Sequence, residues 1–378
     1  MRPPFASRSS LIFILVLAAL SLALFFVPTG FESTLYANSV RAKVRVESVD
    51  NSLVKNYGVT NHGHQSLSIT VLGRRFRGQR YETTNLLMGK LELDTLYEEG
   101  DSALAVLDLD PQNGSVVDVN LVGPYRLGVQ LLLLALFALF LVVYAGKVGL
   151  KALLSFAVSI LVLWKLFIPA ILHGESPIPL AVIMVTVLTA IIIFLVAGFT
   201  RKGLTAFLGA ASGVLVTAIL ALVFGRAFRL HGAIRSFAES LLHSGYGHLD
   251  LTGILYASVF IAAAGAVMDL SMDIAAAVDE IHQRHPALPR GEIIKSGMAV
   301  GRSVVGTMTT TLLFAYSSSY LTLLMVFMAR DIPLENMLNL SYISAEILTT
   351  LVGSFGLVTV APLTALAAGI VYKREKAL

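Results

Sequence analysis

After residue 124 the sequence consists largely of apolar runs about as long as a membrane is thick. Seven such runs follow one another at 127–145, 150–172, 178–199, 204–224, 251–277, 300–328 and 343–372, and an eighth occupies 11–27. A helix needs about 20 apolar residues to cross the hydrocarbon core of a bilayer. We therefore expect a polytopic α-helical membrane protein with about eight transmembrane helices.

The composition supports a lipid environment and excludes several kinds of chemistry. Hydrophobic residues make up 56% of the chain and charged residues only 14%, whereas soluble domains carry about 25% charged residues. The net charge of +4 needs no nucleic-acid partner, because Lys and Arg concentrate in cytoplasmic loops. The chain has no cysteine, which excludes disulfides, thiolate catalysis and cysteine-held metals. We expect no cofactor and no metal.

The first apolar run is preceded by Arg2 and Arg8, and it fits both a signal anchor and the apolar region of a cleaved signal peptide. The sequence VPTGFESTLYA that follows lacks a clean A-x-A cleavage site. This favours an uncleaved N-terminal anchor over residues 1–30. Both interpretations export the segment that follows.

The segment 31–124 changes to the alternation of a half-buried strand. Val40, Ala42, Val44 and Val46 are interleaved with charged residues. Four more β-prone runs at 66–72, 78–84, 102–109 and 115–122 are separated by Gly, Asn, Asp and Pro. We expect a small extracytoplasmic all-β, barrel-like domain of about five antiparallel strands, followed by a seven-helix membrane domain over 125–378.

The cationic residues between the apolar runs set the orientation, because Lys and Arg favour the cytoplasmic side. They fall in alternate loops and at the C-terminus, at Lys147, Lys151, Arg201, Lys202, Arg284, Arg290, Lys295, Lys373, Arg374 and Lys376. Both termini are therefore predicted to be cytoplasmic, in the plasma membrane of a bacterium.

One loop departs from this rule, since Arg226, Arg229 and Arg235 lie on the predicted outer side. We interpret 232–242 as an amphipathic interfacial helix whose basic face meets lipid headgroups.

Three strings in the last predicted spans resemble one known family. They are GAVMDLSMDIA at 265–275, SGMAVGRSVVGTMTTTLLFAY at 296–316 and EILTTLVGSFGLVTVAPLTAL at 346–366. They resemble the YibE/F family of bacterial multi-pass membrane proteins. The resemblance implies a multi-pass architecture with an extracytoplasmic β-rich segment after the first span, and it carries over no catalytic residue.

Ionisable residues mark the predicted span that begins at 251. Asp269, Asp273 and Glu280 are spaced i, i+4 and i+11, which places them on one stripe of a helix. Such groups cost several kcal/mol inside a membrane unless they face protein, a partner or water. Arg302 opens the next span on the same predicted side and is the expected counter-charge. The alternative is an interfacial carboxylate pair and a structural salt bridge.

Small and hydroxyl residues mark the last two predicted spans. Thr307, Thr310 and Ser318 either line a polar path or allow close contact between helices. Glu346 begins a span that contains Pro362, which predicts a broken or kinked helix of the kind that forms ion sites in transporters.

The β-rich segment carries a basic hairpin with Arg74, Arg75, Arg77 and Arg80. It is either a solvated surface or a contact for anionic headgroups or cell-wall polymer. Across the whole chain there is no Walker A, G-x-S-x-G or H-E-x-x-H motif. We therefore expect neither an ATP-driven pump nor an enzyme.

Two hypotheses follow. The first is a secondary transporter or permease for an unknown ion or small solute, coupled through Asp269, Asp273, Arg302 and Glu346. The second is a non-transporting scaffold or assembly protein, whose β domain binds an extracytoplasmic partner. A membrane anchor needs one span and this chain has about eight, which favours transport. Either kind of protein could be a homo-oligomer in the bilayer.

Overall fold

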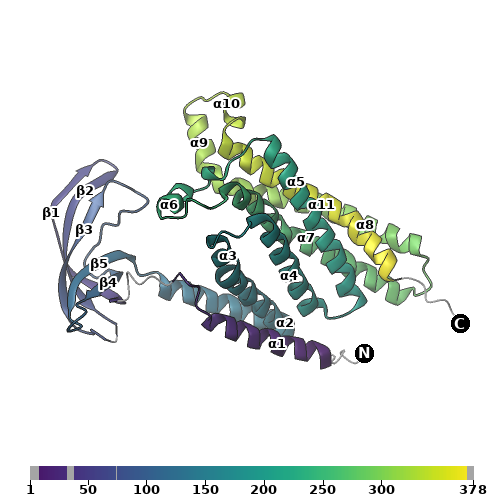
Figure 1. Cartoon of the computed structure of the whole chain (residues 1–378), viewed down its shortest axis with the longest axis horizontal. Helices are drawn as coiled ribbons and strands as arrows, with labels where there is room; N and C mark the ends of the chain where they lie inside the picture. Colours follow the sequence, from purple (N-terminus) through teal and green to yellow (C-terminus); the bar gives the residue numbers. More distant parts are fainter. Residues whose placement is uncertain (1–7, 32–37, 74, 373–378) are drawn as a thin grey trace. The chain divides into compact units, whose positions relative to one another are not determined.

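The computed structural model describes residues 8–31, 38–73 and 75–372 (Figure 1). Of the residues discussed above, Arg2, Arg74, Lys373, Arg374 and Lys376 lie outside this part of the chain. Contacts divide the chain into two units. One comprises residues 31–143, and the other comprises residues 1–30 together with 144–378.

The alternating segment forms five antiparallel strands, as predicted. They are β1 (Ser39–Tyr57), β2 (Thr60–Val71), β3 (Arg80–Met88), β4 (Ser102–Leu109) and β5 (Val116–Pro124). Their order in the sheet is β3-β2-β1-β4-β5. Strand β1 is long enough to pair with both β2 and β4, so that Val44 lies opposite both Val71 and Ala103.

The sheet curls into a nearly closed barrel. The Thr83 hydroxyl of β3 donates to the carbonyl of Val119 in β5 at 2.5 Å, which joins the two outermost strands. The alternate residues Ala42, Val44 and Val46 point inward and are buried. This confirms the predicted barrel-like domain, and the strand order is that of a five-stranded Greek-key barrel of the OB type.

A polar network closes one end of this barrel. The segment between β3 and β4 places Tyr97 inside, with only 2% of the residue exposed. The Gln65 amide donates to the Tyr97 carbonyl at 2.8 Å and to Asn51 Oδ1 at 2.9 Å, and its Oε1 accepts from the Tyr97 amide and from Asn85 Nδ2. Burial raises the pKa of the Tyr97 hydroxyl.

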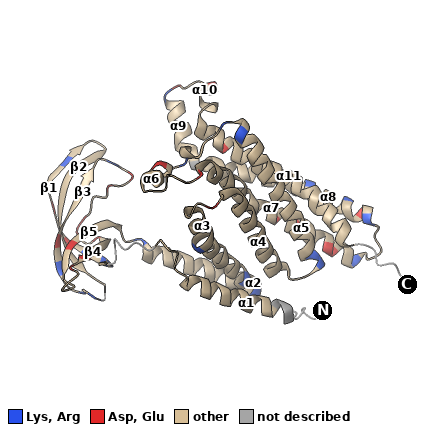
Figure 2. Ribbon diagram, viewed as in Figure 1, with Lys and Arg blue, Asp and Glu red and all other residues tan. Residues whose placement is uncertain are grey.

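The remainder of the chain is helical. The main helices are α1 (Arg8–Phe26), α2 (Leu127–Val162), α3 (Ile168–Leu172), α4 (Pro177–Ala197), α5 (Arg201–Ala227), α7 (Leu251–Arg284), α8 (Arg290–Ser317), α9 (Leu321–Ala329), α10 (Leu334–Leu338) and α11 (Ser341–Val371). Most of the helical length carries no charge, and many of the charged residues lie near helix ends and on the barrel (Figure 2).

Within the described residues, five helical runs are long and apolar enough to cross a membrane. A sixth is obtained if α8 and α9, which are bent by 69° relative to each other, count as one span. The apolar part of α1, Leu11–Phe26, is shorter. The chain is therefore a membrane protein with several apolar helices.

One of these runs, Leu127–Leu172, contains a break. It has 46 residues, which at 1.5 Å per residue would extend about 69 Å, more than twice the thickness of the hydrocarbon core of about 30 Å. Gly146 interrupts the helix with φ 54° and ψ −126°, a conformation that suits glycine because it has no Cβ. The break falls between the predicted runs 127–145 and 150–172.

The centre of the bundle is held by close contacts among α5, α7 and α11. A Cβ on Gly209 of α5 would lie 2.0 Å from the hydroxyl oxygen of Thr364, and one on Gly356 of α11 would lie 2.3 Å from a Thr217 methyl. The Ser271 hydroxyl of α7 donates to the Ala206 carbonyl of α5. Small residues allow backbones to approach in this way, as is common where membrane helices meet.

The loop between α5 and α7 differs from the expectation. The single interfacial helix predicted over 232–242 is wrong, because the chain forms a short 3-10 turn, Gly232–Ile234, and a separate helix α6, Ala238–His243. Phe237 lies between them with φ 65°, a left-handed conformation that no continuous helix contains. The same loop then ends at Asp250, whose carboxylate caps α7 by accepting from the Gly253 amide at 2.8 Å.

We predict that Gly209→Ala destabilises the bundle. The added methyl group would also lie 2.9 Å from the Thr364 Cα, so α5 and α11 must separate, at a cost of about 1–3 kcal/mol. The measurement is thermal unfolding of the detergent-purified chain, followed by size-exclusion chromatography. Gly291→Ala is the matched control, because no atom lies within 4 Å of its added methyl group. Equal melting temperatures for the two variants would contradict the packing described.

Candidate functional site

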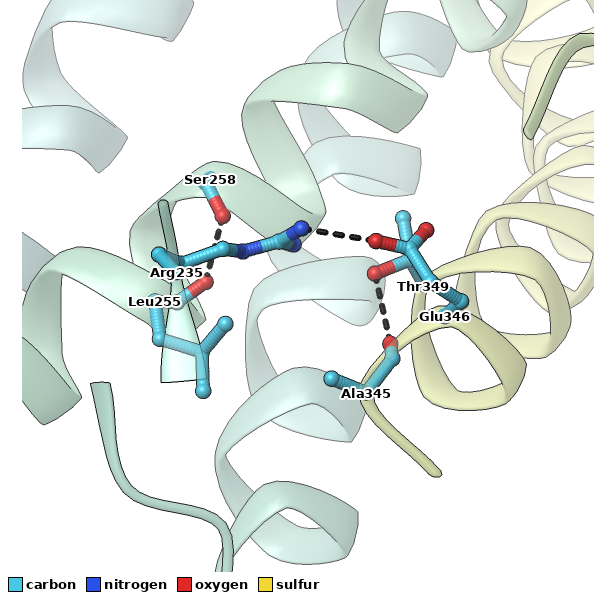
Figure 3. A network of polar contacts seen from close by, with 6 residues as sticks. All are labelled: Arg235, Leu255, Ser258, Ala345, Glu346 and Thr349. Atoms are coloured by element: carbon cyan, nitrogen blue, oxygen red, sulfur yellow. Dashed lines mark hydrogen bonds and ion pairs between the residues drawn. The ribbon is translucent and has the colours of Figure 1, made fainter. Parts of the chain in front are cut away.

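An ion pair lies between the α5–α7 loop and α11. The Arg235 guanidinium donates to Glu346 Oε1 at 2.7 Å (Figure 3). The Glu346 side chain is 17% exposed and that of Arg235 is 38% exposed. Glu346 lies in the second turn of α11, whereas Arg235 follows the 3-10 turn Gly232–Ile234. Arg235 is one of the three arginines on the predicted outer side of the membrane, and Glu346 is its partner.

The ion pair borders a cleft of about 390 Å³ between three helices. Its lining residues come from α7, α8, α11 and the α5–α7 loop, and they are Arg235, Ile254, Leu255, Ser258, Ala262, Tyr316, Glu346 and Thr349. A smaller cavity of about 140 Å³ also borders Arg235 and Glu346, and Tyr320 and Tyr342 line it. The charged pair thus lies in the walls of both cavities.

Two hydroxyl groups of this cleft are oriented by their own helices. The Ser258 hydroxyl donates to the Leu255 carbonyl at 2.7 Å, and the Thr349 hydroxyl donates to the Ala345 carbonyl at 2.8 Å (Figure 3). Because these protons are already used, both oxygens are left with lone pairs to offer a ligand. Together with the Glu346 carboxylate, they make a site suited to a cation or to a hydrogen-bond donor.

The polar surface of α7 continues from this cleft. Ser258 and Ala262 line the cleft, and Gly265, Asp269, Asp273, Ala276 and Glu280 follow at steps of three or four residues. Residues at these steps share one face of a helix. From Ala262 onward each of them is exposed in the single chain. We call this series, from Ser258 to Glu280, the acidic face of α7.

The other predicted site residues do not join the cleft. In the part of the chain that the structure describes, no ion pair connects Arg302 with Asp269 or Asp273. Thr307, Thr310 and Ser318 are exposed. Their hydroxyls donate to carbonyls of α8, at Val304, Gly306 and Ala315 respectively. Of the predicted coupling residues, the structure therefore places only Glu346 in the cleft, and Asp269 and Asp273 on the face that leads away from it.

Helix α11 also differs from the expectation. It is continuous over 31 residues and contains Pro362 in its interior. Of the two expected forms, the broken helix is therefore wrong, and a kink at Pro362 stays a prediction. The interruptions lie at Gly146 and between α8 and α9.

Sequence reasoning missed two polar contacts among the helices and their loops. It did not pair Arg235 with Glu346, because these residues are 111 positions apart. The arginines on the predicted outer side were the only available signal. Sequence reasoning also assigned no contact to Lys165. This residue lies in a π-helical turn, Leu163–Phe167, and donates to the Val27 carbonyl at 2.7 Å.

The barrel carries a separate basic surface. Arg45 of β1 and Arg80 of β3 are exposed and lie on either side of Thr70 of β2. In the described chain no ion pair is formed by either arginine. Lys43 lies over the Tyr125 ring at 4.9 Å, and Arg75 over the Phe76 ring at 5.2 Å. This part of the barrel therefore presents several cationic side chains.

We predict that Arg235 and Glu346 are coupled in stability. Arg235→Glu places two carboxylates together and should lower the melting temperature, whereas the double variant Arg235→Glu/Glu346→Arg should recover part of the loss. The measurement is a double-mutant cycle on the detergent-purified chain. Arg229→Glu, on the same loop, is the control that shows the effect of net charge alone. Additive effects within about 0.3–0.5 kcal/mol would show that the pair is not coupled.

Comparison with protein families identifies the family of this chain. A profile of the family described as YibE/F-like protein matches residues 133–374, which is more than half of the chain. Searches of curated proteins and of solved structures found no match. The matched range includes the ion pair, the cleft and the whole acidic face of α7. The chain therefore belongs to the YibE/F-like protein family.

Proposed function

We propose that this protein is a secondary transporter or permease of the bacterial plasma membrane, with intramembrane carboxylates that couple the movement of protons or small cations. The observation that carries the proposal is the acidic face of α7. It begins in the cleft at Arg235 and Glu346 and continues through Asp269 and Asp273 to Glu280. Ionisable groups on a membrane helix are a frequent mark of an ion or substrate path.

The length of this face matches the thickness of a membrane. Ser258 and Glu280 are 22 positions apart, which is about 33 Å along a helix, close to the hydrocarbon thickness of about 30 Å. In the eight-span topology, with both termini cytoplasmic and a turn at Gly146, the cleft is extracytoplasmic and Glu280 is cytoplasmic. The acidic face would then connect the two sides of the bilayer.

The charges of the path favour cations. Arg235 neutralises Glu346 at the mouth, while Asp269 and Asp273 add negative charge farther along α7. A cation that enters the cleft can replace the Arg235 guanidinium at the Glu346 carboxylate, which opens the mouth. Protonation of Asp269 or Asp273 then changes the charge of the path, which links proton movement to cation movement.

The proposal predicts proton-coupled flux in proteoliposomes. A pH-sensitive dye inside the vesicles reports proton movement on addition of Na⁺, K⁺, Mg²⁺ or spermidine outside. Wild type should respond to at least one cation, and Asp269→Asn and Glu346→Gln should reduce the response about tenfold or more, because each removes a carboxylate from the path.

Glu292→Gln is the matched control for this experiment. It removes a carboxylate from α8 that pairs with Lys295 at 2.9 Å and lies outside the path, so flux should stay within about twofold of wild type. A well-folded wild type with no flux for any cation would refute the transporter, and unchanged flux in Asp269→Asn would refute the assigned path.

The basic surface of the barrel supports a second candidate function, in which the barrel binds an anionic partner outside the cell membrane. Arg45 and Arg80 are two strands apart, about 10 Å, a spacing suited to neighbouring phosphate or carboxylate groups of a polymer. Such a protein would act as a scaffold, with the helices as its anchor.

This candidate predicts binding of a polyanion by the full chain in detergent. Fluorescently labelled polyphosphate should bind wild type, and Arg45→Glu/Arg80→Glu should weaken binding about tenfold or more, measured by fluorescence anisotropy at fixed salt. Lys55→Glu changes an exposed cation elsewhere on β1 and serves as the control. Equal affinities for the two variants would show that this surface is not the binding site.

A further inference from the structure

The acidic face of α7 is uncovered in the single chain. Asp269 and Asp273 are exposed, and a Cβ on Gly265 between them and the cleft would meet no atom within 4 Å. A carboxylate in this position would contact lipid, at a cost of several kcal/mol. A membrane protein that keeps such residues needs something to cover them.

Helix α8 presents an uncovered surface of small residues. Ala299, Ser303, Gly306 and Thr310 are exposed and recur every three or four positions, while Gly297 and Gly301 on the opposite side are buried. Gly306 has no atom within 4 Å of an added Cβ. Small residues at this spacing allow another helix to approach closely.

Exposed surfaces elsewhere in the bundle have a different composition. On α5, Leu215, Ile219 and Val223 are 54%, 51% and 56% exposed, and large apolar side chains of this kind suit a surface that faces lipid tails. The exposed residues on the outward side of α8 are smaller and more polar than these residues of α5. Its residues suit a protein contact rather than lipid.

The register between α7 and α8 places opposite charges at one depth. A Cβ on Gly301 would lie 3.3 Å from Ile274, and one on Gly297 would lie 3.4 Å from Val278. A position four residues earlier in α8 thus lies level with a position four residues later in α7. The same register places Arg302, the residue after Gly301, level with Asp273, the residue before Ile274. Both side chains are exposed, and in the described residues no ion pair joins them.

We propose that a second copy of this chain covers the uncovered surfaces of α7 and α8, and that Arg302 of each copy pairs with Asp273 of the other. Two copies in one membrane share their orientation, so a two-fold axis along the membrane normal brings residues of equal depth together. The surface is complementary to itself, because it carries the cation and the carboxylate at the same level. The proposal concerns assembly and holds whether or not the protein transports cations.

The natural absence of cysteine makes the contact directly testable. Ala299→Cys, Ser303→Cys, Gly306→Cys and Thr310→Cys are each oxidised with copper phenanthroline in native membranes. A disulfide requires Cα atoms within about 7 Å, so at least one of the four should yield a product of twice the chain mass. Ile219→Cys on α5 is the apolar control and should yield none. Absence of the product at all four positions, or equal amounts with Ile219→Cys, would overturn the proposal.

Charge reversal tests the pairing itself. Arg302→Asp and Asp273→Arg variants are co-expressed with different affinity tags. In a mixed dimer every contact joins opposite charges, whereas each variant paired with itself meets like charges. Mixed dimers should therefore exceed self-dimers about tenfold, a coupling of about 1.4 kcal/mol, as measured by tandem affinity purification. Equal recovery of mixed and self-dimers would overturn the Arg302–Asp273 contact, and an intrachain pair would not produce the preference for mixed dimers.

Discussion

The close approach of α5, α7 and α11 determines how the rest of the bundle is arranged. Lipid tails are as apolar as leucine side chains, so helices in a bilayer associate through close packing and polar contacts rather than through expulsion of water. At Gly209 and Gly356 the contact leaves no room for a methyl group. Because the Val267 and Ser271 side of α7 packs in this contact, the exposed part of its acidic face, from Gly265 to Glu280, points away from α5 and α11. The position of the polar residues is thus a consequence of the packing.

Helices α7 and α11 are joined by polar contacts toward both ends. At one end the loop before α7 reaches α11 through Arg235 and Glu346. At the other end the Tyr372 hydroxyl, just after α11, donates to the Asp279 carboxylate at 2.7 Å.

Local patterns in the sequence predicted the helices and strands. The features that they did not predict depend on contacts between residues far apart in the chain. Alternation around Val44 identified β1, and apolar length identified the helices. The order of the strands, the closing contact from Thr83 to Val119 and the pairing of Arg235 with Glu346 depend on residues far apart in the chain, for which a single sequence has no signal. The predicted helix over 232–242 was wrong because its charge pattern was helical, whereas Phe237 adopts a left-handed conformation. Arg302 was expected to pair with Asp269 or Asp273, and among the described residues no ion pair joins it to either of them.

The Gln65 network has a consequence for how the barrel holds together. Small exported domains often depend on disulfides, which form only where an oxidant is present. Here one buried amide satisfies both backbone groups of Tyr97 and ties the segment between β3 and β4 to β2. Hydrogen bonds of this kind need no electron acceptor, so the closed end of the barrel is indifferent to redox conditions. The closed end of the barrel can therefore form in an oxidising or a reducing environment alike.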